Sequence, residues 1–156
     1  MTRLFTFLSI LFSTTALAAP EMILECLAGQ PKGGYCEGMT RVRVKRYEDG
    51  SMKATLHGAS ASVNTAQTWK ILESSEETET LTYSGTNRDG GTFSLSVDTT
   101  EEATYTSQNR RCLNELHRNF QGVKGTLNFV AVYKPAFRPK VIETKKDLKV
   151  VCKVSE

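Results

Sequence analysis

The length and charge of this chain exclude several classes of protein. Its 156 residues include 20 lysines and arginines and 17 aspartates and glutamates, a net charge of +3 that is too balanced to indicate a nucleic-acid or membrane-surface binder. The length suits one domain that buries roughly two-thirds of its unfolded surface.

The first 18 residues have the pattern of a secretory signal peptide. Arg3 gives a positive start, Leu4–Phe12 is apolar but too short to span a bilayer, and Ala16-Leu17-Ala18 matches the A-x-A cleavage pattern. We expect cleavage after Ala18. No second apolar run follows, so we expect no transmembrane segment, and residues 19–156 should form a single secreted β domain, periplasmic or extracellular.

Period-two alternation predicts strands in the first third of that domain. Met22–Ala28 places its apolar residues on one side. Arg41–Gly58 predicts a hairpin, and a two-residue turn would split its apolar residues between two faces. A three-residue loop, Glu48-Asp49-Gly50, instead pairs Val44 with Ala54 and places Gly50 in the left-handed position.

The clearest hairpin is Glu79–Asp98, which follows a predicted strand at Trp69–Leu72. Apolar residues alternate with serine and threonine on both sides of the turn sequence Gly85–Gly91. We expect Tyr83 to pair with Phe93, which puts every apolar side chain on one face.

The alternation breaks over Thr99–Gln121. Apolar residues three to four positions apart predict a short helix near 107–120, with Ser107 or Thr106 as N-cap and Cys112 on its buried side. Strands are expected again at Thr126–Tyr133, over a short stretch from Val141 to Glu143, and from Leu148 to Val154.

About seven or eight short strands with one short helix predict a mainly β fold, an antiparallel barrel or a curved sandwich. The even number of cysteines in an exported chain favours two disulfides, and no close cysteine pair suits zinc. We favour Cys26–Cys152 with Cys36–Cys112, because the first pair would join the terminal strands. The alternative is Cys26–Cys36 with Cys112–Cys152.

The expected architecture is similar to that of small exported bacterial β-barrels, including lipocalin-like and lysozyme-inhibitor proteins. The lipocalin Gly-x-Trp is absent, because Gln67 and Thr68 precede Trp69. An inhibitor that enters the cleft of a basic lysozyme would be acidic, whereas this chain is slightly basic. We therefore assign no family, since architecture does not fix function.

No catalytic, metal or cofactor site is expected. The two histidines, His57 and His117, lie in no hydrolase or metalloprotease motif and are predicted to be surface residues. The acidic residues of 73–79 lack the spacing of a calcium loop.

The candidate binding residues are the cations of the first hairpin. Arg41, Arg43, Lys45 and Lys53 are predicted to share one solvent-facing side, together with His57. Such a face would attract phosphates, acidic glycans or an acidic protein, above all if it merged with a second basic group (Arg138, Lys140, Lys145, Lys146, Lys149 and Lys153). The alternative is that these cations only protect the edges of the sheet from pairing with other chains and keep the protein soluble.

Aromatic residues offer a different kind of site. They could line a ligand cavity inside a barrel or simply pack in its core; they are Tyr35, Tyr47, Trp69, Tyr105 and Tyr133.

The sequence thus predicts an exported, non-enzymatic, disulfide-bonded β domain, a monomer, that binds an envelope component, a partner protein or a small ligand and no nucleic acid. The alternatives are a structural or protective envelope protein without a ligand, and a hydrolase that no motif reveals.

Overall fold

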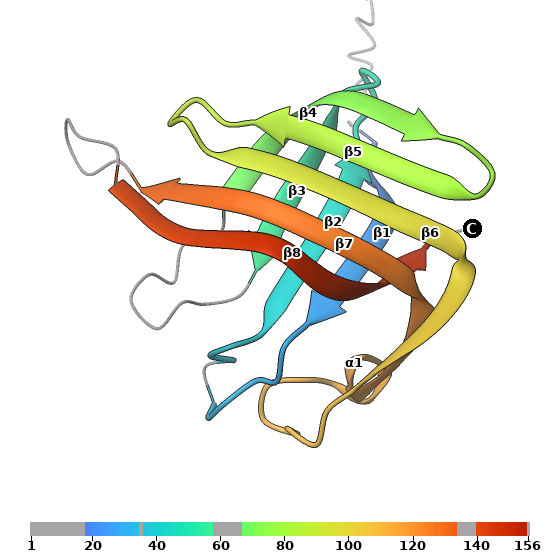
Figure 1. Ribbon diagram of the computed structural model, residues 1–156, viewed down its shortest axis with the longest axis vertical. Helices are drawn as coiled ribbons and strands as arrows, with labels where there is room; N and C mark the ends of the chain where they lie inside the picture. The colour runs from blue at the N-terminus through green and yellow to red at the C-terminus, as the bar shows by residue number, and fades with distance from the viewer. Residues whose placement is uncertain (1–17, 35, 58–66, 134–139, 156) are drawn as a thin grey trace, which may run out of the picture.

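Eight antiparallel strands close into a single barrel, in which each strand neighbours the next along the chain and β8 returns to β1 (Figure 1). The computed structural model describes residues 18–34, 36–57, 67–133 and 140–155, so the predicted signal peptide lies outside it except for Ala18. The elements are β1 (Glu21–Ala28), β2 (Thr40–Arg46), β3 (Met52–His57), β4 (Gln67–Glu76), β5 (Thr80–Thr86), β6 (Thr92–Thr106), α1 (Glu115–Arg118), β7 (Asn119–Tyr133) and β8 (Lys140–Val154). The predicted mainly β fold is confirmed, and of its two forms the barrel is the one observed.

The barrel interior is filled by side chains. The inward residues of the strands form one apolar cluster, and many of them have no exposed surface. Trp69 is the largest of the fully buried side chains described, and its ring centroid lies 5.5 Å from that of Phe93 and 5.8 Å from that of Phe129. Its indole Nε1 donates a hydrogen bond to the Val130 carbonyl across the barrel, at 3.3 Å. An eight-stranded barrel is just wide enough for such filling.

The predicted strand register is correct for one hairpin and wrong for the other. In β2–β3, Val44 pairs with Ala54 and Gly50 has a φ of +80°, so the predicted three-residue loop is confirmed. In β5–β6, the predicted pairing of Tyr83 with Phe93 is wrong, because Tyr83 pairs with Leu95. The true register differs by two residues, which leaves the apolar side chains on the same inward face.

The predicted short helix is confirmed within 107–120, but the break in alternation over 99–121 does not end the sheet. β6 continues to Thr106 and β7 begins at Asn119, with a bulge in their pairing between Asp98 and Glu102. The helix is limited to α1, and its N-cap is Asn114, whose side chain accepts a hydrogen bond from the His117 amide at 3.0 Å. At the other end of the chain, the two short stretches expected after residue 140 form the single strand β8.

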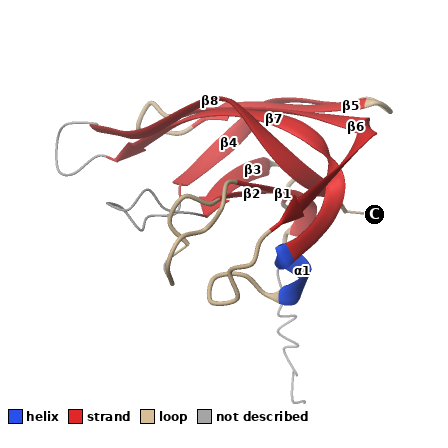
Figure 2. Ribbon diagram, turned by 60° about the horizontal axis from the view of Figure 1, so that its bottom comes forward, coloured by secondary structure: helices blue, strands red, loops and turns tan. Residues whose placement is uncertain are grey.

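Residues 107–118, here called the tip, join β6 to β7 and pack against the outside of the barrel beside the β1–β2 loop (Figure 2). A second apolar cluster forms there from Leu27, Met39, Tyr105, Leu113 and Phe120. The Tyr105 hydroxyl donates to the Gly29 carbonyl at 2.8 Å, and the Asn109 amide donates to the carbonyls of Pro31 and Gly33. The long hairpin therefore bends back and fastens onto the first loop.

Two disulfides hold these connections, and their pairing is the favoured one. Cys26 and Cys152 are paired in register on β1 and β8, so this bond links the first and last strands. Cys36–Cys112 ties the β1–β2 loop to the tip. Cys112 precedes α1 instead of lying on a helix, so its predicted helical placement is wrong.

Candidate functional site

Three lysines lie side by side on the outer face of the barrel. Lys45 on β2 is directly opposite Lys53 on β3, which is directly opposite Lys70 on β4. We call these three residues the lysine row. Their sequence neighbours Val44, Ala54 and Trp69 are buried in the interior, so the lysines point away from the core.

The lysine row is an unfavourable arrangement in isolation. Like charges directly opposite on neighbouring strands repel and destabilise a sheet. Within the part of the chain that the structure describes, none of the three lysines forms an ion pair with a carboxylate. Lys53 also lies 4.8 Å from the centre of the Tyr47 ring, which places its ammonium over an aromatic face.

The predicted basic face divides into two parts. Lys45 and Lys53 belong to the lysine row, but Arg41 and Arg43 turn toward Glu25 on β1. Glu25 Oε1 forms ion pairs with Arg41 and, at 3.2 Å, with Arg43. Both arginine side chains are therefore already engaged in ion pairs within the protein.

His117 completes that contact from the tip. Its Nε2 lies 3.2 Å from Glu25 Oε1 and 3.2 Å from the Arg41 guanidinium, and its side chain is only 13% exposed. The expectation of an ordinary surface histidine is thus wrong for His117. We call Glu25, Arg41, Arg43 and His117 the charged network; it links β1, β2 and the tip.

The charged network sets the ionisation of Glu25. Burial alone would raise the pKa of this carboxyl, but the hydrogen bond and charge of Arg41, the charge of Arg43 and the contact with His117 together lower the pKa below its ordinary 4.5. Because the pKa is lowered on folding, ionised Glu25 stabilises the fold above about pH 4.5. That contribution is lost as the pH falls through the lower pKa of the folded state.

Glu25→Gln should therefore lower the free energy of unfolding at pH 7 by about 1–3 kcal/mol, because it leaves partly buried arginines without their carboxylate. The difference from the unaltered protein should begin to shrink as the pH drops below 4.5, where Glu25 becomes protonated in the unfolded chain, and should vanish once the pH has fallen through the lower pKa of the folded state. Urea unfolding across this pH range measures the difference, and Glu115→Gln on the exposed side of the tip is the control. A difference that stays constant with pH would contradict the role given to Glu25.

His57 belongs to the same predicted basic face, beside the arginines of the charged network, and contributes little positive charge at neutral pH. It pairs with Arg41 on the neighbouring strand. Burial, followed by the positive charges of Arg43, Arg41 and Lys45, lowers the pKa of His57 below its ordinary 6.5. The positive charge of this face therefore comes from its lysines and arginines.

A groove of about 560 Å³ opens beside the lysine row. Lys53 and Lys70 form one side, and the turn after β5 supplies Thr86, Asn87 and Arg88. Leu72 also lines the groove and is 60% exposed. The groove thus combines three cations with one carboxylate, polar groups and one apolar side chain. The carboxylate is Asp89, which lies 3.9 Å from the Arg88 guanidinium, so Lys53 and Lys70 are the lining cations without a described ion pair.

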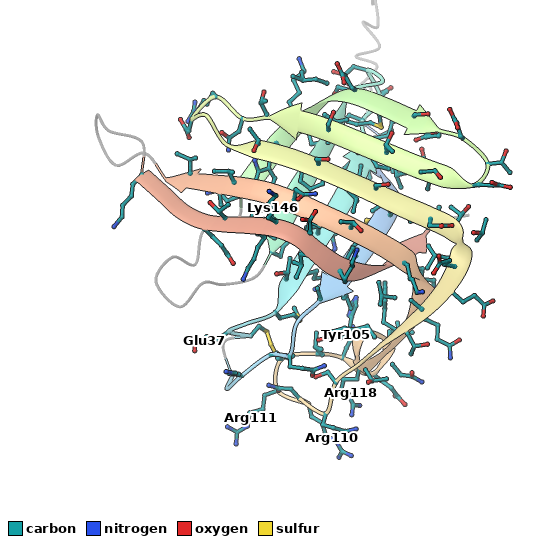
Figure 3. All side chains as sticks on the ribbon, viewed as in Figure 1. Glu37, Tyr105, Arg110, Arg111, Arg118 and Lys146 are labelled. Atoms are coloured by element: carbon teal, nitrogen blue, oxygen red, sulfur yellow. A yellow bond between two sulfur atoms is a disulfide. The ribbon has the colours of Figure 1, made fainter. Side chains whose placement is uncertain are left out.

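Two other charged regions lie on different strands from the lysine row. A hollow of about 630 Å³ across β6, β7 and β8 is lined by both Lys124 and Glu101, which pair with each other. The lysines of the second basic group lie on β8, where Lys146 is labelled in Figure 3. The two basic groups could merge only if the first hairpin neighboured the C-terminal strand, and this condition is not met because β1 lies between β8 and β2. Arg138 lies outside the described residues.

Of the two alternatives for the aromatic residues, a cavity lining or packing, the described ones show packing. Trp69 is packed in the core, Tyr105 belongs to the outer cluster, and Tyr47 lies beneath Lys53. Tyr35 and the side chain of Tyr133 lie outside the described parts of the structure.

Two features are absent from the residues that the structure describes. They contain no group of three or more histidine, cysteine, aspartate or glutamate side chains that is arranged to hold a metal ion. They also contain no helix with the length and apolar character needed to cross a bilayer.

No family model matches this chain, and comparison with curated proteins and with solved structures finds no significant match to either. The fold and the surface described above therefore carry the functional argument.

Proposed function

We propose that this protein is an exported, non-enzymatic binding module that holds an anionic partner on the lysine row. The observation that carries the proposal is the direct opposition of Lys45, Lys53 and Lys70 on three neighbouring strands, with no ion pair to any described carboxylate. An anion on this surface would relieve the repulsion among the three ammonium groups.

Two other features support the proposal. The packed interior, with Trp69 and Phe129 almost completely buried, favours binding on the outer surface over binding inside the barrel. The two disulfides suit an oxidising compartment outside the cytosol.

The test compares two variants with the same change in charge. The first replaces Lys45, Lys53 and Lys70 by glutamine, and the second replaces Lys145, Lys146 and Lys149 on β8. With dextran sulfate as the probe at low salt, we expect the first variant to bind at least about tenfold more weakly than the unaltered protein, a loss of about 1.4 kcal/mol. The β8 variant should lose much less.

Added salt should weaken binding of the unaltered protein, because exposed charges are screened. Equal losses in the two variants would show that dextran sulfate responds only to net charge, and would overturn the proposed role of the lysine row. Circular dichroism of both variants confirms that each remains folded.

A further inference from the structure

We infer that the anionic partner is an acidic polysaccharide, whose carboxylated sugar residues lie across β2, β3 and β4 along the lysine row. This inference rests on the proposed function and specifies its ligand. It follows from the spacing of the charges, the uncharged groups around them and the closure of the sheet.

The lysine row runs across the strands and not along them. Neighbouring strands lie about 4.8 Å apart, so the attachment points of the three lysines span about 10 Å. On β5 the next residue in register with Lys70 is Thr86, which continues the line with a hydroxyl. The groove is lined by Lys53 and Lys70 of the row and, on the turn after β5, by Arg88 together with its partner Asp89. A linear chain with repeated negative charges matches this track better than a single small anion does.

The uncharged side chains beside the row are mostly hydroxyls and amides. Thr55 pairs with Thr68 in a second line parallel to the lysine row, two residues along the strands. Thr86 and Asn87 lie at the far side of the groove, where Asn87 Oδ1 already accepts hydrogen bonds from two loop amides and its side-chain nitrogen remains as a donor. Such groups both donate and accept hydrogen bonds, as the hydroxyls of a sugar require. Leu72, exposed among them, offers an apolar surface for the carbon-bound hydrogens of a sugar ring.

The same composition argues against a protein partner. The centres of protein interfaces are enriched in aromatic residues, methionine and arginine and depleted in lysine. Around the lysine row, Leu72 is the large apolar residue that is exposed, while the Tyr47 ring is already covered by Lys53. The strands β2, β3 and β4 are paired on both sides, so an acidic peptide has no sheet edge to extend at this face.

The experiment measures binding of the full mature chain to two carboxylated polymers, polygalacturonate and poly-L-glutamate, compared at equal carboxylate concentration and ionic strength. Neutral dextran serves as the uncharged sugar control. We expect polygalacturonate to bind at least about tenfold more tightly than poly-L-glutamate, and neutral dextran not to bind. Replacing the three lysines by glutamine should weaken binding to both charged polymers.

A second variant tests recognition of the sugar itself. Replacing Thr68 and Thr86 by valine keeps both charge and shape while removing two hydroxyls from the face. This variant should lose affinity for polygalacturonate by about fivefold to tenfold, because sugar hydroxyls are left without partners, and should bind poly-L-glutamate as before.

The outcomes separate the two proposals. Equal affinity of the unaltered protein for the two polymers, with binding still dependent on the lysine row, would overturn the polysaccharide and leave the anion-binding function intact. Tighter binding to poly-L-glutamate would instead identify an acidic protein segment as the better ligand. Binding of dextran sulfate that does not depend on the lysine row would overturn both.

Discussion

Replacing Cys26 and Cys152 together by alanine should lower the free energy of unfolding by about 4 kcal/mol. The two cysteines are 126 residues apart, so their bond removes a large amount of conformational freedom from the unfolded chain. They also join β1 to β8, the pairing that closes the barrel. Equilibrium unfolding in guanidinium chloride, followed by circular dichroism, measures the change.

The control replaces Cys36 and Cys112 by alanine. This bond lies outside the barrel, so its loss should increase amide hydrogen exchange mainly in the tip and the β1–β2 loop. Exchange in β1 and β8 should rise only in the Cys26/Cys152 variant. A loss below about 1 kcal/mol in that variant would mean that strand pairing alone closes the barrel.

Trp69→Ala should lower the free energy of unfolding by about 4 kcal/mol, which is within the range for truncating a large aromatic residue in a packed core. Trp69 has no exposed surface, contacts Phe93 and Phe129, and supplies the hydrogen bond to the Val130 carbonyl. The substitution would therefore leave a cavity and an acceptor without its donor. Urea unfolding followed by circular dichroism is suitable, because the variant lacks the only tryptophan of the chain.

Leu72→Ala on the same strand is the matched control. Leu72 is 60% exposed, and removing it should change the free energy of unfolding by no more than about 0.5 kcal/mol. If the two substitutions had similar effects, the interior around Trp69 would be less tightly packed than the structure shows.

Local alternation predicted the strands well because it reports which side chains face the core. It also determined the β2–β3 loop, since a loop one residue shorter would have put apolar residues on both faces. The same reasoning was wrong for β5–β6. A shift of two residues preserves the faces, so alternation does not distinguish Phe93 from Leu95 as the partner of Tyr83. The Asn87 side chain favours the observed loop by accepting hydrogen bonds from the amides of Asp89 and Gly91.

The candidate site was predicted in part for a similar reason. Lys45 and Lys53 belong to one hairpin, and their shared face could be read from its sequence. Lys70 was missed because its place depends on how β4 pairs with β3, across a connection without a clear turn pattern. The contact of His117 with Glu25 was missed because it depends on the tip folding back over the barrel, which no local pattern indicates.

The bond between the first and last strands also determines how the molecule carries mechanical load. If its two ends are pulled apart, tension enters β1 and leaves through β8 at the Cys26–Cys152 bond, and the rest of the barrel lies outside the load path. Only the segments beyond the two cysteines can lengthen while that bond is intact. A partner held on β2, β3 and β4 would then be carried on a surface that is shielded from force applied through the ends of the chain.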